Sequence, residues 1–559
     1  MSNTQTKKAP NRWIGLLFIS LAISIVIIDG TIVNTIFPSV IADLKLTSTE
    51  VLWVQEGYVL VFASLLLVFG TIGDRIGRRR LLIIGIAIFV VASVWAGMSN
   101  DASSMVLARI VQGIGGAMVL PTTLSLVNAT FQGKERGIAF AVWGSTIGGM
   151  VAVGPVLGGW LATDFDWRWA FNINLPIGLI IIIGLLIFAT ESKQAQRAGK
   201  IDWTGAAISV VMFSSLVFGL IEGRTFGWWT VNPENQFAIG DFKWATTGIS
   251  VIPFALTIFV ISTIVFVMWE RKREAAGKNV ILDLNLFNIS SFRNGSIAAG
   301  IISLGEFGLL FAIPIWLQNV EGLSAISSGL VLLWLAGGAF LASAVGGALN
   351  GKLAPNNAVR IGVFLELIAV AGIAFVASNE GGWAGIAPFL FVYGIGIGLA
   401  TAQLTGVIMV DVPMDKAGQA SGSQSTVRQI GSALGIAVLG TVLFSFTQSS
   451  IESRIQALPS LSVIEESARA DLAVAVAKPV SDSAGAAIAA IPAILAPQNL
   501  SAEAVADITL ATKEGFTDGM KATGWAAALF LVLGLASTFN LGSAKTAPAA
   551  TTRQKKAKK

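Results

Sequence analysis

The chain has 559 residues, of which 54% are hydrophobic and only 12% are charged, with a net charge of +5. Soluble globular proteins carry about twice that share of charged residues, so the composition excludes a soluble domain and predicts a polytopic membrane protein. The chain contains no cysteine and no histidine, which excludes disulfides, thiolate chemistry, the usual zinc sites and every His-dependent catalytic triad. We therefore expect a protein that is not an enzyme and that uses no cofactor or metal.

The first twelve residues are polar and lead directly into a full-length apolar stretch without a small-residue cleavage site, so we expect no removable signal peptide. A helix needs about 20 apolar residues to cross a hydrocarbon core of roughly 30 Å. Stretches of this kind predict fourteen transmembrane helices, at residues 14–36, 51–69, 81–98, 104–127, 138–162, 171–189, 203–222, 246–269, 295–317, 328–349, 359–377, 385–410, 423–446 and 522–541.

Basic residues are concentrated in alternate connections between these spans. Lys7 and Lys8 begin this series and the lysine-rich tail ends it, whereas the opposite loops carry single basic residues such as Lys45 and Arg168. Basic residues in short loops are retained in the cytoplasm, so we expect a cell-membrane protein with cytoplasmic N- and C-termini. The same asymmetry explains the net charge without nucleic-acid binding.

The connection between the second and third spans, residues 70–80, combines three glycines, one aspartate and four arginines. The arginines place it at the cytoplasmic face, and the glycines remove side chains where two helix ends must approach closely. The aspartate can lie against a helix N-terminus or an arginine. A merely basic loop with incidental glycines is the alternative. The residues to which we assign a conformational role here are Gly70, Gly73, Asp74, Arg75, Gly77 and Arg78.

A faint internal repeat predicts two six-helix halves. Residues 347–355 lie where a degenerate copy of the 70–80 loop would fall, and residues 134–137 are mirrored by residues 415–418. Two such halves around a central cleft are the usual plan of a transporter, with the seventh and eighth spans as an inserted pair; chance similarity of glycine-rich loops is the alternative. The predicted parts are a cytoplasmic tail at 1–13, an N-terminal bundle at 14–189, linkers and inserted helices at 190–291, a C-terminal bundle at 292–541 and a basic tail at 542–559.

Residues 447–520 form a long segment before the last span, on the side of the membrane away from the cytoplasm. The segment is rich in alanine, and its one apolar stretch, residues 484–496, is too short to cross a bilayer. We expect short amphipathic helices that cap the outer mouth or, as the alternative, an irregular linker.

Asp29 in the first span and Arg109 in the fourth are charged residues inside predicted membrane helices. An acid in a span is costly to ionise and is by default a functional residue that can exchange a proton. A buried arginine must be paired, and Asp29 is a candidate partner for Arg109. Protonation of Asp29 would then release Arg109 and act as a switch. A purely structural carboxylate and a purely structural salt bridge are the alternatives.

Four further carboxylates, those of Glu56, Glu222, Glu306 and Glu366, lie in predicted spans, and Glu306 is the most central. Several acids in an aromatic and aliphatic bundle suit a lipophilic cation, held by charge and by ring faces. An interhelical hydrogen bond or a position at the water interface is the alternative for each. We assign proton coupling to Glu56 and Glu306 together with the Asp29 pair. The residues that we assign to substrate binding are Glu56, Glu306, Asn34, Trp53, Trp143, Phe307 and Trp316.

The fifth span combines glycines with Pro155, directly after Gly154, which indicates a closely packed helix that can kink. Arg428 is a second buried base, nearer the cytoplasm. We assign a conformational role to these three residues, with plain packing or a structural salt bridge as the alternatives.

Together these motifs resemble a known family. The 70–80 loop, Arg109 with Gln112 and Gly113, and the pair Gly154 and Pro155 resemble three signatures of the major facilitator superfamily, the third being typical of its exporters. Further residues are similar to its fourteen-helix drug:proton antiporter branch, namely Asp29, Thr31, Asn34 and Pro38 in the first span and segments within residues 167–178, 314–329 and 418–429.

The resemblance covers nearly the whole chain apart from residues 447–520 and the tails. It implies an all-α membrane protein with the major facilitator fold, two six-helix halves plus two inserted helices. It also implies proton-driven export by alternating access, with Asp29 as proton site and Arg109 as its coupling partner. The chain departs from the first-helix motif at residues 35–37, while Glu56 and Glu306 are not general positions of the superfamily.

We therefore predict a proton-coupled antiporter that exports lipophilic, cationic drugs across the cytoplasmic membrane. Its partners are the small-molecule substrate, protons and the bilayer, without nucleic acid, and we expect a monomer driven by the proton gradient. An exporter of a lipid or cell-envelope precursor is one alternative, and a non-transporting membrane receptor or assembly factor is another.

Overall fold

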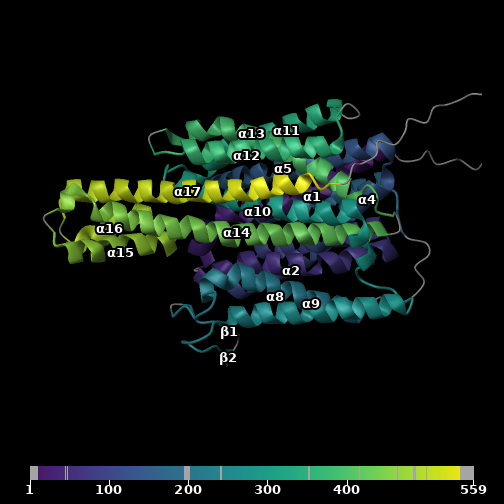
Figure 1. The fold of residues 1–559 in the computed structure, drawn as a ribbon, viewed down its shortest axis with the longest axis horizontal. Coiled ribbons are helices and arrows are strands. Elements are labelled where there is room, and N and C mark those ends of the chain that lie inside the picture. The colour runs from purple at the N-terminus through teal and green to yellow at the C-terminus, as the bar shows by residue number, and fades with distance from the viewer. Residues whose placement is uncertain are drawn as a thin grey trace, which may run out of the picture.

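The computed structural model is almost entirely helical (Figure 1). It describes residues 11–44, 46, 48–193, 202–233, 235–239, 242–349, 353–379, 381–413, 416–462, 464–482, 486–498 and 500–541. The helices are α1 (Arg12–Leu44), α2 (Ser48–Ile76), α3 (Arg78–Gly97), α4 (Ala102–Thr130), α5 (Gly133–Asp164), α6 (Trp169–Asn172), α7 (Asn174–Phe188), α8 (Trp203–Phe226), α9 (Val251–Ala275), α10 (Ser290–Asn319), α11 (Ala325–Leu349), α12 (Pro355–Val376), α13 (Gly382–Met409), α14 (Ala417–Gln456), α15 (Glu466–Asp482), α16 (Ile491–Leu495) and α17 (Ala502–Thr538). A two-stranded antiparallel hairpin, β1 (Ala238–Ile239) and β2 (Phe242–Lys243), lies between α8 and α9, and short 3₁₀ turns cover Leu284–Asn288, Pro459–Leu461, Ala486–Ala490 and Ala496–Gln498.

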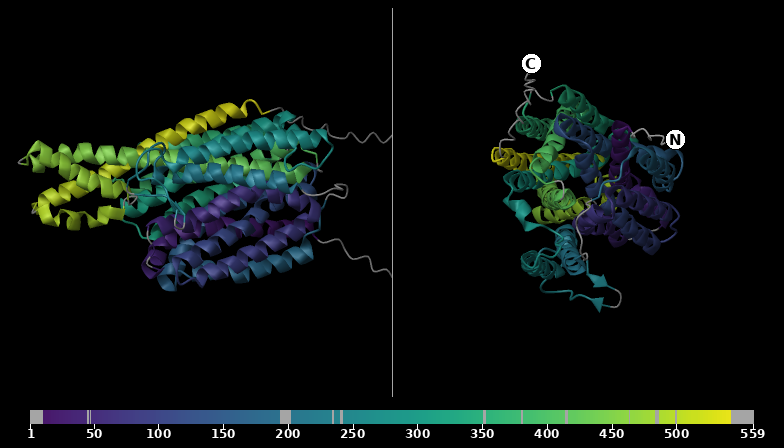
Figure 2. Two further views of the ribbon diagram at one scale, coloured as in Figure 1. Left: turned by 90° about the horizontal axis from the view of Figure 1, so that it is seen from below. Right: turned by 90° about the vertical axis from the view of Figure 1, so that its right-hand side faces the viewer.

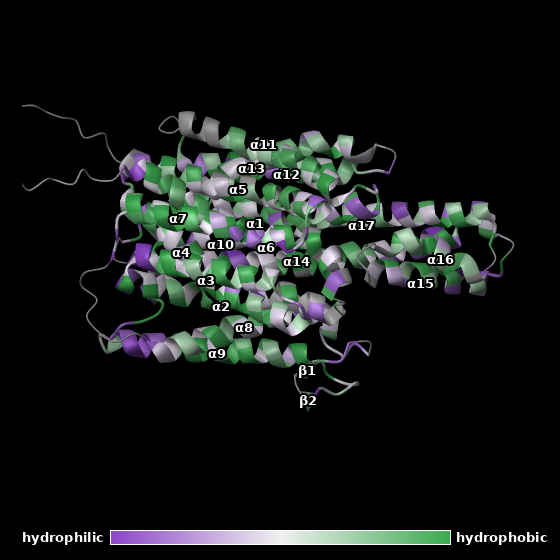
Figure 3. Cartoon of the chain, turned by 180° about the vertical axis from the view of Figure 1, so that it is seen from behind, coloured by the Kyte–Doolittle hydropathy of each residue, from purple (hydrophilic) through white to green (hydrophobic). Residues whose placement is uncertain are grey.

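Each predicted span lies on a helix, the sixth on the pair α6 and α7. Within the described residues, 11 helices are long and apolar enough to cross a membrane, or up to 12 if the bent α2 is one span. The bend in α2 is 55°, between the segments Gly57–Leu66 and Val68–Ile76. The all-α polytopic fold is thus confirmed, while the count of fourteen spans is not. In Figure 3, hydrophobic residues predominate along the bundle and hydrophilic residues gather near helix ends, most visibly at one end of α9.

Polar side chains fix several helix ends. Asp101, Asp202, Ser250 and Ser501 each accept a hydrogen bond from a backbone N–H in the first turn of the helix that follows. Such caps satisfy donors that have no partner inside the helix. They explain why α4, α8, α9 and α17 begin where they do.

The helices form two groups that follow the chain order, each around its own apolar core. In the N-terminal group α4 packs against α2 and α3, and α1 packs against α5; in the C-terminal group α12 packs against α13, and α10 and α17 pack against α14. The groups meet where α2 packs against α14 and where α5 packs against α11 and α13. Figure 2 shows the N-terminal group, in purple and blue, beside the C-terminal group, in teal and green.

The helices α8 and α9 stand at one side of this arrangement (Figures 1 and 2). The helix α8 packs against α2 and α14, and α9 packs mainly against α8. An apolar cluster that includes Val68 of α2, Met212 of α8, Phe266 of α9 and Ile281 holds the pair to the bundle.

The segment 447–520 is mostly helical in its described parts, and it does not consist only of short caps. The helix α14 has 40 residues and α17 has 37, and both continue well past the ends of their neighbours (Figure 1). At 1.5 Å per residue, α14 is about 60 Å long, about twice the hydrocarbon thickness. The helix α15 packs on the projecting part of α14, with Ala473, Val476 and Val480 buried. A helical projection therefore stands where we expected short helices or a linker.

Candidate functional site

Asp29 and Arg109 form an ion pair in the interior of the N-terminal group. Arg109 Nη1 donates to Asp29 Oδ2 at 2.6 Å, and both side chains are 0% exposed. The residues come from α1 and α4, 80 positions apart in the chain. Two buried charges are tolerated only when they are paired and further hydrogen-bonded, and removal of one partner is strongly destabilising. The pair that we expected from the sequence is therefore formed.

Two amides complete the shell around Asp29. Gln112 Nε2 donates to Asp29 Oδ1 at 2.7 Å, and Gln112 Oε1 accepts from Arg109 Nη1 at the same distance. Asn174 Nδ2 donates to Asp29 Oδ1 at 3.3 Å and to Ser93 Oγ at 2.8 Å, and Ser93 donates in turn to the Phe171 carbonyl. The carboxylate thus accepts hydrogen bonds from side chains of both α4 and α7 inside an apolar bundle.

Aromatic rings cover the guanidinium of Arg109. The guanidinium carbon lies 4.4 Å from the ring centroid of Tyr58 and 5.9 Å from that of Phe171. Ring faces attract a desolvated cation, so these contacts hold Arg109 on the side that Asp29 does not reach. Gly154 of α5 lies against Thr31, two residues after Asp29, and a β-carbon at Gly154 would overlap the Thr31 hydroxyl. The glycine therefore sets how closely α5 approaches α1 beside the ion pair.

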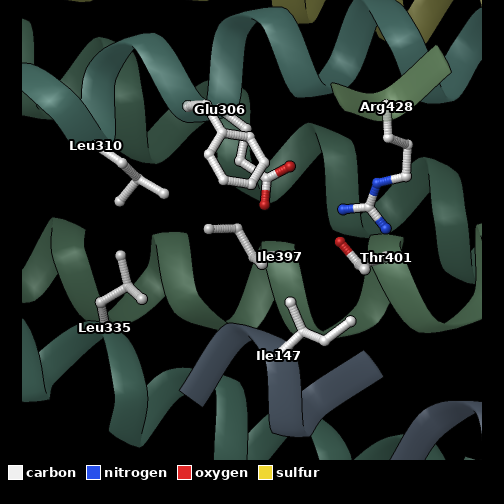
Figure 4. Close-up of a pocket in the computed structure, with 8 residues that line it drawn as sticks. Ile147, Glu306, Leu310, Leu335, Ile397, Thr401 and Arg428 are labelled. Atoms are coloured by element: carbon white, nitrogen blue, oxygen red, sulfur yellow. The ribbon is translucent and has the colours of Figure 1, made fainter. Parts of the chain in front are cut away.

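A narrow cavity lies between the two groups of helices. Its lining includes Glu306, Phe307 and Leu310 of α10, Thr401 of α13, Arg428 of α14 and Ile147 of α5, the last from the N-terminal group. Figure 4 shows the Glu306 carboxylate and the Arg428 guanidinium directed into the space between α10 and α13, with Ile147 opposite. A drug-sized ligand needs a pocket of about 300 Å³ or more that buries most of its surface. The cavity is closed around Glu306 and Arg428 in this conformation, so the two groups of helices would need to separate before a ligand could enter.

The two groups are also joined at the end of the bundle that carries the 70–80 loop. Asp74 of α2 accepts hydrogen bonds from Arg78, at 2.7 and 2.9 Å, and from the backbone N–H of Gly418 at 2.9 Å. Gly70 lies so close to α14 that a β-carbon there would be 2.6 Å from the Gly418 carbonyl oxygen. Gly77 has a φ of 114°, a conformation that L side chains rarely adopt, and Glu191 bonds the N–H groups of Arg79 and Arg80 at the start of α3. The loop therefore lies in a contact between the groups, as its glycines indicated.

The segment that follows α9 takes part in the same contact. The carbonyl of Ile281 accepts from Thr71 of α2 at 2.8 Å and from Gln419 of α14 at 3.0 Å. Its N–H donates to Glu270 of α9 at 3.0 Å, and Asp283 pairs with Lys416. Residues 280–283, which we call the strap, thus bind both groups of helices and α9 at once.

The chain is also similar to known proteins. Residues 19–436 match the Major Facilitator Superfamily. The chain belongs to this superfamily. It is a multi-pass membrane transporter and not an enzyme.

Among its relatives is the tetracenomycin C resistance and export protein of Streptomyces glaucescens, 29% identical over 78% of this chain and 76% of that protein. The multidrug efflux pump LfrA of Mycolicibacterium smegmatis is 30% identical over 80% of this chain and 84% of that protein. The probable actinorhodin transporter of Streptomyces coelicolor is 31% identical over 79% of this chain and 74% of that protein. Among solved structures, the human organic anion transporter MFSD10 (TETRAN) matches with a TM-score of 0.55 over 93% of this chain and 100% of that chain, at 11% identity, which shows a shared fold.

In this transporter the predicted site residues fall into separate places. Asp29 and Arg109 lie within the N-terminal group, whereas Glu306, Phe307 and Arg428 line the cavity. Trp143 is buried and donates to Thr123 at 3.3 Å within the N-terminal group, while Trp53 of α2 is half-buried. The side chains of Glu56, Asn34 and Pro155 lie outside the part of the chain that the structure describes, as does the side-chain environment of Pro38 in the first-helix motif.

Trp316 lies away from the cavity. Its indole N–H donates to Thr517 of α17 at 3.0 Å, and its side chain is 0% exposed in the core of the C-terminal group. Its place favours a packing role. Gly73, by contrast, lies against Thr122 of α4 and Leu81 of α3 within the N-terminal group, and Arg75 is half-buried at the end of α2.

Sequence reasoning did not select Ser93, Asn174 or Tyr58 as site residues. Asn174 stands in an apolar stretch, where an amide must find a hydrogen-bond partner, so its presence was a signal. Tyr58 lies about one turn after the buried Val54 on α2 and carries no such signal, because a tyrosine in a span is ordinary at a membrane interface.

Proposed function

We propose that this transporter exports lipophilic, cationic drugs in exchange for protons. The observation that carries the proposal is the fully buried pair Asp29 and Arg109, joined at 2.6 Å and closed by Gln112 and Asn174. Several relatives are named as multidrug or antibiotic-resistance proteins, which supports drug export as the class of reaction.

Protonation of Asp29 is the coupling step in this proposal. A proton on Asp29 removes the charge that holds Arg109, and Arg109 is then left buried beside Tyr58 without a counter-ion. The arrangement of α1 and α4 that suits the ion pair no longer suits the protonated form, so the two protonation states favour different conformations. Protonation shifts the equilibrium between the two conformations by a free energy equal to the difference in their proton affinity.

The cavity between the groups is the proposed place of the cation. Glu306 supplies negative charge and Phe307 a ring face, next to the apolar side chains of Leu310 and Ile147. Opening of the 70–80 contact, with its hydrogen bond between Asp74 and Gly418, would admit substrate from the side that we predict to be cytoplasmic.

The energy of the proton gradient is sufficient for such exchange. One unit of pH difference supplies about 1.4 kcal/mol per proton. A membrane potential adds about 2.3 kcal/mol per charge for each 100 mV.

The test is proton movement in vesicles that contain the purified protein. We expect ethidium to drive sustained proton transport across the vesicle membrane by the wild type, and Asp29→Asn and Glu306→Gln to lose this transport. If the wild type does not respond to ethidium while a lipid or an anionic envelope precursor elicits flux, drug export is the wrong proposal. Absence of flux with every substrate would favour a receptor or assembly factor.

A further inference from the structure

Glu366 of α12 is a buried carboxylate that the proposed mechanism does not yet use. Its side chain is 0% exposed, and among the described residues neither of its carboxylate oxygens has a hydrogen-bond partner. It lies directly against α13, because a β-carbon at Gly396 would come within 2.6 Å of Glu366 Cγ. Buried polar groups almost always have partners, so such a carboxylate needs an explanation.

The surroundings of Glu366 contain one acid, one base and one phenol. Glu306 of α10 and Arg428 of α14 are the charged groups that act on it electrostatically. Tyr393 of α13 lies one turn before Gly396 and donates its hydroxyl to the backbone carbonyl of Glu306 at 3.0 Å. Glu306 and Arg428 line the cavity, whereas Glu366 is not among the residues that line it.

The charges of this cluster do not balance when both acids are ionised. Arg428 compensates one carboxylate, and a second ionised carboxylate in an apolar interior without a donor is costly. The cluster is neutral in two ways only: with one proton on the acid pair, or with one monovalent cation beside it. A proton and a cation therefore compete for the same negative charge.

We propose that Glu366, together with Glu306 and Arg428, forms a second proton-binding site in the C-terminal group, from which a bound cation displaces the proton. The O–H bond of the protonated acid breaks, the proton leaves to water through the cavity, and the cation takes over the balance of charge. This inference rests on the proposed export of cations, and it names the residue that sets the exchange at one proton per cation in this group.

The experiment measures protons released when ethidium is added to purified protein in weakly buffered detergent solution with a pH indicator dye. Asp29→Asn provides the background, because it removes the proton site of the N-terminal group. We expect Asp29→Asn to release about one proton per bound cation, and the double variant Asp29→Asn, Glu366→Gln to release none and to bind ethidium at least about tenfold more weakly. Glu222→Gln is the matched control, since Glu222 is a buried glutamate on α8, outside this cluster.

One further variant and one further measurement make the outcome decisive. Glu366→Asp retains the acid and should restore the release, which separates loss of the proton from loss of folding. The infrared C=O band of a protonated carboxyl should disappear when ethidium binds to the Asp29→Asn protein, and this readout does not depend on whether Glu366→Gln folds. If the double variant releases as many protons as Asp29→Asn alone, or if that band does not change, the second site is wrong while drug export stands. If even the wild type releases no proton, the export proposal falls first and this inference falls with it.

Discussion

The backbone N–H of Gly418 on α14 donates to Asp74 Oδ2 on α2 at 2.9 Å, and this hydrogen bond joins the two groups of helices. The other carboxylate oxygen of Asp74 accepts from Arg78, so the buried acid has donors on both sides. Any conformation that opens this end of the transporter must break the bond to Gly418 and expose Asp74 and Arg78 to new partners. The closeness of the contact depends on glycine at positions 70 and 418, because a side chain at either would meet the opposite helix.

Replacement of Gly70 by alanine should therefore open this end. The new β-carbon would lie 2.6 Å from the Gly418 carbonyl, a backbone atom that cannot turn aside, and overpacking of this kind costs about 1–3 kcal/mol. We expect a longer distance between spin labels at Ile76→Cys and Asn357→Cys, which is convenient to measure because the chain has no cysteine of its own, and transport slower by about tenfold. Gly440→Ala on α14 is the control, since its β-carbon would make only an ordinary contact at 3.6 Å with Phe311. An unchanged distance in Gly70→Ala would contradict the role of this contact.

The shell of Asp29 provides a second prediction. Asn174→Ala removes one donor to the carboxylate, and loss of a hydrogen bond to a charged group costs about 1.5–3 kcal/mol. Asn174→Asp has nearly the same shape but places an acceptor beside Asp29, so we expect it to reduce ethidium efflux and the melting temperature more than alanine does. Ser93→Ala leaves the bond between Asn174 and Asp29 in place and should have the smallest effect of the three. Equal losses for Asn174→Ala and Asn174→Asp would mean that the charge of Asp29 does not matter at this position.

The sequence is sufficient to predict the ion pair, because only a partner could make two charges tolerable at that depth of a membrane. It also indicates which direction each residue of a helix faces relative to its neighbours. Phe307 and Trp316 are nine residues apart on α10, about 180° around the helix, and only Phe307 faces the cavity while Trp316 faces α17. Their spacing in the sequence therefore argues against both rings contacting the same ligand.

Other features could not be read from the chain. The end of an apolar stretch does not mark the end of a helix, and so α14 and α17 continue into a segment that hydropathy alone describes as a loop. The strap was not predicted either, because its hydrogen bonds come from backbone atoms of Val280 and Ile281, which any residue type could provide. The cluster around Glu366 depends on how α10, α12 and α14 meet in space.

The strap leads to a third prediction. Gln419 Nε2 donates to the carbonyls of Val280 and Ile281 at 2.8 and 3.0 Å, and Gln419→Glu replaces this donor by an acceptor of the same shape. We expect amide hydrogen exchange in residues 280–283 to become at least about tenfold faster, which corresponds to about 1.4 kcal/mol of lost protection. Gln456→Glu, an exposed position on the same helix, should leave the exchange unchanged. If Gln419→Glu also leaves it unchanged, the strap is held mainly by the apolar packing of Ile281 against α2, α8 and α9.

A fourth prediction concerns pH at the opposite end of the bundle. Asp43 lies beyond the predicted span 14–36, and Arg168 donates to it at 2.7 Å while the Trp167 indole N–H donates at 3.1 Å. These hydrogen bonds, that of Arg168 first, hold the pKa of the Asp43 carboxyl below its ordinary value of 3.8. A lowered pKa means that the folded protein prefers the ionised acid, so the stabilisation is present above the ordinary pKa and is lost as the pH falls through the lowered value. The guanidinium of Arg168 lies 4.5 Å from the Trp167 ring, so the difference in tryptophan fluorescence between the wild type and an Asp43 variant reports on this end. We expect the wild type to show a fluorescence change at acidic pH, below the ordinary aspartate value, that Asp43→Asn lacks.

At neutral pH Asp43→Asn should melt at a slightly lower temperature, since both side chains are partly exposed and the pair is screened by water. The difference between the two proteins should disappear as the acid becomes protonated. A difference in melting temperature that persists at low pH would show that Asp43 stabilises this end by its shape and not by its charge.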